Sequence, residues 1–220
     1  MRALVFDAYG TLFDVLSVTS LCELLFPGSG TSLAVMWRSK QLQYSLLRSM
    51  MERYADFWQI TQDALVYATR ALQLDLTAEK RVQLMDAYRT LHAFPDVQPG
   101  LRQLRSKGVG LAILSNGEPR MLESATRSAG IADLLDCVIS VDDVKVFKPS
   151  PRVYGLAAAR LAVPVGDIGF VSSNGWDVAG ATSAGLTAFW IQRSASEPPE
   201  ELGYKAAYVV HAITDLPAHI

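Results

Sequence analysis

Short apolar runs alternate with longer amphipathic segments over much of the chain. Residues 4–6 (Leu-Val-Phe) form one such run, and further runs of strand length occupy residues 109–114, 137–141, 168–171, 187–191 and 207–210. Continuous apolar runs are typical of strands that are buried on both faces of a parallel sheet. Helical patterns lie between the later runs, at residues 100–107, 120–129, 151–161 and 176–184. This alternation predicts an α/β fold with a doubly wound, mostly parallel, Rossmann-like sheet.

Residues 15–94 have a different pattern, because no strand signal interrupts them. Helices are predicted at residues 15–26, 31–51, 56–72 and 77–91. In the second of these segments, apolar residues recur at helical spacing and predict one buried face, made of Leu33, Trp37, Tyr44, Leu47 and Met51. We therefore expect an all-helical cap domain, residues 15–94, inserted after the first strand of a core domain made of residues 1–14 and 95–220.

Composition narrows the class of protein. The chain has 220 residues, of which 50% are hydrophobic and 19% charged, as is ordinary for a globular protein. A net charge of −2 and a pI near 5.9 indicate neither a nucleic-acid nor a membrane partner. No apolar run approaches the ~18 residues of a membrane span, and the first strand begins too close to Met1 to leave room for a secretory signal. We expect a cytoplasmic protein in which Cys22 and Cys137, which lack metal-ligand spacing, are buried free thiols.

Polar residues gather where the predicted strands end. They are Asp7 with Thr11, Ser115 with Asn116, Lys148, and Ser172, Ser173 and Asn174 with Asp177. Each group alone is explained by turn chemistry, by helix capping or by an exposed lysine. In a parallel sheet, however, the carboxyl ends of the strands share one edge, and ligands bind in the crevice beyond it. Together these groups predict one functional site, with Asp7 as a candidate nucleophile or metal ligand.

Four segments resemble the motifs of the haloacid dehalogenase superfamily. They are residues 6–14 (FDAYGTLFD), 114–117 (LSNG), 148–149 (KP) and 170–177 (FVSSNGWD). Residues 37–42 (WRSKQL) and the Ser-Ser-Asn-x-Trp-Asp pattern are similar to the type II (S)-2-haloacid dehalogenases in particular. The resemblance runs the length of the chain. It implies an enzyme that hydrolyses short 2-haloalkanoic acids and releases halide.

The resemblance implies a nucleophilic displacement by Asp7, which would form an ester with the substrate carbon. Lys148 would keep Asp7 ionised, while Thr11 and Asn174 would orient its oxygens. Arg38, from the helical insertion, would receive the departing halide. Backside displacement predicts inversion, from an (S)-2-haloacid to an (R)-2-hydroxy acid.

The same resemblance assigns the remaining site residues. The substrate carboxylate would bind Ser115, Asn116 and the amides of a helix start. A dry wall around the carbon–halogen bond would be formed by Tyr9, Leu42, Phe57 and Trp176. In the second step Asp177 would orient the water that attacks the ester, supported by Ser172 and Tyr154. The resemblance also implies a homodimer.

Two other functions stay open at this point. Most of the superfamily are phosphatases, whose second Asp and later acidic residue help to bind magnesium; this chain has Tyr9 at the first of these positions and Ser172 or Ser173 at the second. A phenol with a pKa of ~10 is no acid catalyst near neutral pH, and magnesium would have too few anionic oxygen ligands. We therefore expect neither a metal nor an organic cofactor, and a phosphatase acting on a small phosphate ester is the first alternative. The second is a catalytically silent binding protein, although such a protein has no need for all four of Asp7, Lys148, Arg38 and Asp177.

Overall fold

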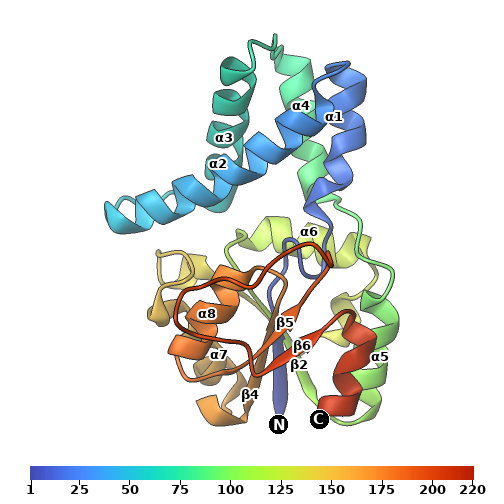
Figure 1. Ribbon diagram of the computed structural model, residues 1–220, viewed down its shortest axis with the longest axis vertical. Coiled ribbons are helices and arrows are strands. Elements are labelled where there is room, and N and C mark those ends of the chain that lie inside the picture. The colour runs from blue at the N-terminus through green and yellow to red at the C-terminus, as the bar shows by residue number, and fades with distance from the viewer.

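Strand β1 (Ala3–Phe6) lies at the centre of a parallel sheet in the computed structural model, which describes residues 1–220 (Figure 1). The six strands lie in the order β3-β2-β1-β4-β5-β6, and every neighbouring pair is parallel. The other strands are β2 (Gly110–Ser115), β3 (Cys137–Ser140), β4 (Ile168–Ser172), β5 (Thr187–Ile191) and β6 (Tyr208–Val210). The predicted doubly wound parallel sheet is confirmed.

The position of β1 determines where a ligand can bind. Val5 is paired with Ala112 of β2 on one side and with Phe170 of β4 on the other. From β1 the chain proceeds outward through β2 and β3, and then returns to the opposite side of β1 to form β4. Such a reversal opens a crevice at the carboxyl ends of the central strands. Asp7 directly follows β1 and therefore lies at this reversal of the strand order, at the carboxyl edge of the sheet.

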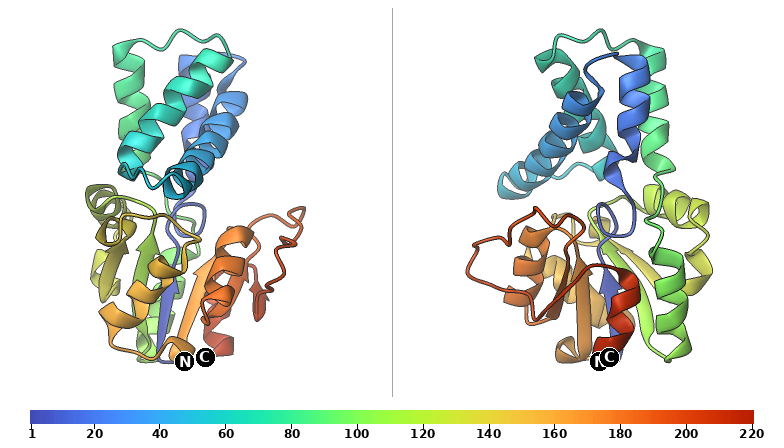
Figure 2. Two further views of the ribbon diagram at one scale, coloured as in Figure 1. Left: turned by 90° about the vertical axis from the view of Figure 1, so that its left-hand side faces the viewer. Right: turned by 45° about the vertical axis from the view of Figure 1, so that its right-hand side comes forward.

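Helices cover both faces of the sheet (Figure 2). Helices α7 (Pro151–Leu161) and α8 (Gly175–Ser183) contact each other, with α7 against β2 and β3 and α8 against β4 and β5. Helix α5 (Val97–Ser106) packs on β2 and on the C-terminal 3₁₀ helix η5 (Ile213–His219), and α6 (Pro119–Ser128) packs on β3. Short 3₁₀ helices occupy Ala132–Leu134 (η2), Val141–Asp143 (η3) and Val165–Asp167 (η4).

Helix α5 begins at Val97, three residues before the predicted start at residue 100. Pro99 lies in the first turn, where its missing N–H has no intrahelical partner to lose. A Cβ atom at Gly100 would lie 2.5 Å from a side-chain atom of Ile213, so the glycine allows η5 to pack closely on the helix.

The predicted helical insertion contains only helices, and it lies above the carboxyl edge of the sheet (Figure 1). After the 3₁₀ helix η1 (Val15–Val18) come α1 (Thr19–Leu25), α2 (Gly30–Met50), α3 (Phe57–Ala71) and α4 (Ala78–Arg89). Asp56 and Thr77 cap the amino ends of α3 and α4 with their side chains. We call α1–α4 the cap; its division from the core after residues 14 and 94 stays a prediction.

The predicted apolar face of α2 is wrong in its second half. Leu33 and Trp37 are buried, but Leu47 and Met51 are 42% and 58% exposed. The carboxyl half of α2 projects beyond the other cap helices (Figure 1). The buried residues of this half are polar, namely Gln41 and Ser45.

The chain crosses between sheet and cap twice, and the two crossings lie side by side. The N–H of Asp14 donates to the carbonyl of His92 at 2.8 Å, and that of Phe94 donates to Leu12 at 3.0 Å. Both chain ends lie at the opposite, lower end of the sheet (Figure 1). Cys22 is a buried free thiol, as predicted, whereas Cys137 is a free thiol that is only half-buried. None of the helices combines the length and the apolar character needed to traverse a bilayer.

Candidate active site

Three charged side chains from distant parts of the chain meet beyond β1. The ammonium group of Lys148 lies 3.1 Å from Oδ1 of Asp7 and 2.9 Å from Oδ2 of Asp177. Asp7 follows β1, Lys148 precedes α7, and Asp177 lies in the first turn of α8. The side chains of Lys148 and Asp177 are completely buried, and that of Asp7 is 8% exposed. The structure therefore brings together three of the predicted residues as a buried ionic cluster.

Burial and charge act in opposite directions on this cluster. Burial lowers the pKa of Lys148, but the carboxylates of Asp177 and Asp7 together outweigh it, and the pKa rises above its ordinary value. Burial raises the pKa of Asp177 to about 6, and Asp7 adds to the rise while Lys148 and Tyr154 oppose it. Lys148 is therefore a cation at neutral pH, and the carboxyl group of Asp177 gains or loses its proton near pH 6.

Neutral donors hold the second oxygen of the Asp7 carboxylate. The hydroxyl of Thr11 donates to Oδ2 at 3.0 Å, and the side-chain amide of Asn174 donates to the same atom at 2.8 Å. Thr11 is itself fixed by the N–H of Ser173, which donates to its Oγ1 at 2.9 Å. Both oxygens of Asp7 are thus engaged, one by a cation and the other by two neutral groups.

Tyr154 and Ser172 were both predicted to support Asp177, but only Tyr154 forms a hydrogen bond with its carboxylate. The hydroxyl of Tyr154 donates to Oδ1 of Asp177 at 2.6 Å, so this carboxylate has a partner on each oxygen. Ser172 is also buried, but its Oγ accepts the N–H of Asn174 at 3.1 Å. Ser172 therefore shapes the loop that presents Asn174, and it makes no hydrogen bond to Asp177.

Ser115 and Asn116 lie at the end of β2, buried and partly engaged. Oγ of Ser115 accepts the N–H of Gly117 at 3.0 Å, and Oδ1 of Asn116 accepts the N–H of Lys148 at 3.0 Å. The hydroxyl of Ser115 and the side-chain NH₂ of Asn116 keep their donor capacity.

The expectation that the start of the following helix binds an anion is wrong for α6. The carboxylate of Glu118 caps this helix and accepts the N–H groups of Arg120 and Met121, both at 3.1 Å. A carboxylate therefore already occupies that position. The N–H groups of Ala8 and Tyr9, in contrast, donate to no protein acceptor although both residues are buried. These two amides, which lie next to Asp7 in the chain, thus keep their donor capacity, and the side-chain pattern did not indicate this.

The cap contributes one cation. The guanidinium of Arg38 in α2 donates to the carbonyl of Tyr9 at 3.2 Å, and to Oε1 of Gln41 at 2.7 Å. Both acceptors are neutral, and Arg38 forms no salt bridge, unlike Lys148. The Arg38 side chain thus reaches the loop of Asp7 with its positive charge uncompensated.

Aromatic rings surround this part of the site. The ring of Tyr9 lies 5.7 Å from that of Phe57 and 6.3 Å from those of Phe13 and Tyr88, measured between centroids. The hydroxyl of Tyr9 is buried without a hydrogen-bond partner, and burial raises its pKa. The rings of Tyr9 and Phe57 are therefore neighbours, whereas Leu42 and Trp176 are half-buried. The wall of these four residues around the carbon–halogen bond stays a prediction.

Comparison with known proteins identifies the family. The family model of the haloacid dehalogenase-like hydrolases matches residues 1–185. This chain belongs to the haloacid dehalogenase-like hydrolases.

Relatives of this hydrolase are (S)-2-haloacid dehalogenases. The enzyme of Pseudomonas sp. (strain YL) is 47% identical over 194 residues, which cover 88% of this chain and 84% of the relative. (S)-2-Haloacid dehalogenase 2 of Pseudomonas sp. (strain CBS-3) is 44% identical, covering 99% of this chain and 94% of the relative. The L-2-haloacid dehalogenase of Xanthobacter autotrophicus, solved with chloropropionic acid covalently bound, has a TM-score of 0.93 at 39% identity and covers 99% and 97% of the two chains. These matches confirm the resemblance to the type II dehalogenases.

Several residues that contact the site of this hydrolase were not predicted. Phe147, next to Lys148, donates its N–H to Oγ of Ser49 at 3.0 Å, and its ring stacks on Tyr54 of the cap at 5.0 Å. The hydroxyl of Tyr54 also donates to Asp142 in the core. These contacts join the cap to the loop of Lys148. The only sign of these contacts in the sequence is that an apolar residue, Phe147, precedes Lys148.

Arg193, two residues beyond β5, is another residue that the prediction missed. It donates to the carbonyl of Thr11 at 2.7 Å and pairs with Asp96 at 2.8 Å. Its position just after a strand end is the sequence signal that could have indicated it.

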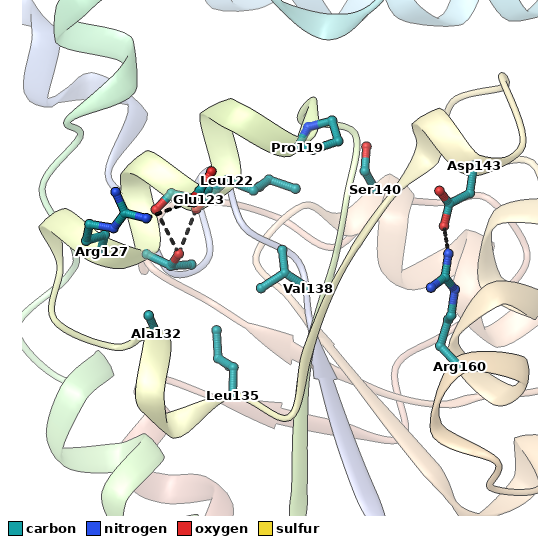
Figure 3. A pocket seen from close by; sticks show the side chains of 11 residues that line it. Pro119, Leu122, Glu123, Arg127, Ala132, Leu135, Val138, Ser140, Asp143 and Arg160 are labelled. Carbon is teal, nitrogen blue, oxygen red and sulfur yellow. Dashed lines mark hydrogen bonds and ion pairs between the residues drawn. The ribbon is translucent and has the colours of Figure 1, made fainter.

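No group of three or more His, Cys, Asp or Glu side chains is arranged to hold a metal ion. A surface pocket of about 440 Å³ lies elsewhere in this hydrolase, between α6, β3 and α7 (Figure 3). It contains the ion pairs Glu123–Arg127 and Asp143–Arg160, and none of the predicted site residues lines it.

Proposed function

We propose that this hydrolase converts short (S)-2-haloalkanoic acids into (R)-2-hydroxy acids and halide, through an ester with Asp7 and without a metal or organic cofactor. The observation that carries the proposal is the unequal pairing of the two cations at the site. Lys148 is bound to the carboxylate of Asp7, whereas Arg38 is held only by neutral oxygens. One cation is thus paired with the nucleophile, and the other is available to an anion that leaves.

In the first step, an oxygen of Asp7 attacks the carbon that bears the halogen, from the side opposite the halogen. A carbon–oxygen bond forms, the carbon–halogen bond breaks with its electron pair, and halide departs toward Arg38. The substrate carboxylate binds the hydroxyl of Ser115, the amide of Asn116 and the free N–H groups of Ala8 and Tyr9. The aromatic wall excludes water, which strengthens these charge interactions.

In the second step, water attacks the carbonyl carbon of the Asp7 ester. Asp177 takes a proton from the water, and Lys148, Thr11 and Asn174 stabilise the negative charge that develops on the Asp7 oxygens. The bond between the acyl carbon of Asp7 and the substrate oxygen then breaks, and Asp177 passes its proton to that oxygen, which releases the hydroxy acid. The second proton of the water leaves to solvent, which regenerates the Asp7 carboxylate. Because this step leaves the substrate carbon untouched, the inversion of the first step persists, and (S) substrate gives (R) product.

Departures from the phosphatase motif support a substrate without phosphate. Tyr9 replaces the carboxylic acid, and its ring contributes to the apolar wall. Ser172 and Ser173 are neutral, so neither provides an anionic ligand for a metal. Ser172 accepts the N–H of Asn174, and Ser173 donates its N–H to Thr11. A phosphate dianion beside Asp7 would be repelled unless a divalent cation bound between them.

The testing experiment measures halide release from (S)- and (R)-2-chloropropionate with a chelator present, and hydrolysis of p-nitrophenyl phosphate in parallel. Chloride from the (S) isomer alone, with (R)-lactate as product, is the expected result. Magnesium-dependent phosphate release without chloride would replace the proposal with a phosphatase. Silence in both assays would favour a binding protein that keeps the fold.

We also propose that the protein is a cytoplasmic homodimer. Apolar side chains on the projecting half of α2 support the dimer: Leu46 and Leu47 are each 42% exposed and Met50 is 81% exposed. Light scattering coupled to size-exclusion chromatography tests it. A mass of 24.0 kDa, that of one chain, would refute the dimer.

A further inference from the structure

Gln41 is a completely buried glutamine that faces Arg38 from one turn further along α2. Its Oε1 accepts from the guanidinium of Arg38 at 2.7 Å and from the hydroxyl of Tyr88 at 3.4 Å. Its Nε2 donates to Oγ1 of Thr61 in α3 at 2.6 Å. A buried carboxamide is costly unless it is hydrogen-bonded, and this one has partners on both ends.

The neighbours of Gln41 fix the direction of its amide. The hydroxyl of Thr61 donates its only proton to the carbonyl of Phe57 at 2.6 Å, and that carbonyl can only accept. Oγ1 of Thr61 must therefore accept a proton from Gln41, which places the NH₂ group toward Thr61. The amide oxygen is consequently turned toward Arg38. The chain of hydrogen bonds has one possible polarity from Phe57 to the guanidinium.

We propose that Gln41 is a positioning residue that holds Arg38 in place while leaving its charge uncompensated, so that the full charge acts on the departing halide. This inference rests on the proposed dehalogenase function. A carboxylate at the same place would hold Arg38 at least as firmly, since a charge-assisted pair is stronger than a neutral one. It would also cancel the charge that the halide needs. The need to position Arg38 therefore does not explain why residue 41 is neutral, whereas the need to preserve the charge of Arg38 does.

The test compares two Gln→Glu substitutions on the same helix. Gln41→Glu adds a negative charge beside Arg38. Gln43→Glu is the matched control, because exposed Gln43 accepts from Lys40 at 2.7 Å with the same spacing of three residues. Thr61→Val removes the group that fixes the amide and keeps the side-chain shape. Thermal unfolding establishes that each variant is folded.

Two readouts separate charge from mere support. The first is inhibition of the full-length enzyme by sodium bromide, and the second is the ratio of turnover with (S)-2-chloropropionate to turnover with (S)-2-bromopropionate. Gln41→Glu should weaken bromide inhibition by about tenfold or more, as expected when one charged stabilising group is lost. It should lower the chloride-to-bromide ratio, because chloride is the poorer leaving group. Thr61→Val should shift both in the same direction by less, and Gln43→Glu should shift neither.

Wild-type bromide inhibition and an unchanged ratio in folded Gln41→Glu would overturn the inference while leaving the dehalogenase function intact. A shift of equal size in Gln43→Glu would also overturn it, since general charge would then be the cause. If Gln41→Glu fails to fold, Thr61→Val decides: an unchanged ratio in that variant refutes the role of Gln41. Absence of halide release from the wild-type enzyme would instead refute the proposed function.

Discussion

The two cations of the site show how differently a core and a cap can hold a positive charge. Lys148, in the core, is completely buried between two carboxylates. Arg38, in the cap, is half-buried and bound only to neutral oxygens. A buried cation with two carboxylates is a permanent part of the fold, because removal of one charge strands the others. A cation whose partners are neutral keeps an uncompensated charge, which can act on a bound ligand. The difference predicts which residue can be removed without loss of structure.

The largest expected effect is on the core side. Asp7→Asn should reduce halide release by at least about a thousandfold, because the amide is a poor nucleophile and no other group forms the ester. The folded structure should persist, as measured by circular dichroism. Asp143→Asn, in an exposed pair with Arg160, is the control and should keep full activity. Wild-type turnover in Asp7→Asn would end the proposed mechanism.

The second prediction addresses the comparison directly. Lys148→Met should lower the free energy of unfolding by roughly 3–5 kcal/mol, since Asp7 and Asp177 would face each other without a cation. Arg38→Met should cost about 1 kcal/mol, because its acceptors keep other donors: Asn174 for Tyr9 and Tyr88 for Gln41. Both variants should lose turnover. Urea unfolding at neutral pH measures the two costs, and equal values would show that the two cations do not differ as argued.

The third prediction concerns pH. Asp177, with its pKa raised to about 6 by burial, can take a proton from water only when ionised. Turnover should therefore be present above pH 6 and fall as the pH drops through this value. The hydroxyl of Tyr154 lowers the pKa of Asp177, so Tyr154→Phe should move the acid limb to higher pH. Turnover measured between pH 5 and 9 tests this, with exposed Tyr204→Phe as the unchanged control.

The smallest expected effect is at Arg193, a third cation that supports the loop of Asp7 from outside the site. Arg193→Met removes the donor to Thr11 and leaves Asp96 without its salt bridge. We expect a loss of about 1–3 kcal/mol in unfolding free energy and a few-fold lower turnover. Arg105→Met, in an exposed pair with Asp136, should change stability by less than ~0.5 kcal/mol. Identical behaviour of the two variants would remove Arg193 from the support of the site.

The sequence predicted the parts of the site that depend on strand ends. Asp7, Lys148, Thr11, Asn174 and Asp177 converge because parallel strands bring their carboxyl ends to one edge, which a pattern of apolar runs is enough to indicate. The type II motif also indicated Arg38.

The contacts between the cap and the core could not be predicted from the sequence. The bonds from Ser49 to Phe147 and from Tyr54 to Asp142 depend on how α2 and α3 sit above the sheet, and no periodicity encodes this. The exposed end of α2 was mistaken for a buried face for the same reason: helical spacing shows which residues share a face, but not whether another element covers it. The capping of α6 by Glu118 was not predicted, because a glutamate before a helix does not by itself show that its carboxylate accepts the first N–H groups of that helix.

The paired crossings at residues 12–14 and 92–94 have an evolutionary consequence. Phe13 and Ala93 form an antiparallel bridge, so the segment between them leaves the core and returns at almost the same point. The strand order of the sheet would be unchanged if a short turn joined these two residues. Arg38 and its neighbours in α1–α4 are therefore joined to the core at one place, so that substitutions or insertions among them can alter what covers the site while Asp7 and Lys148 stay as they are.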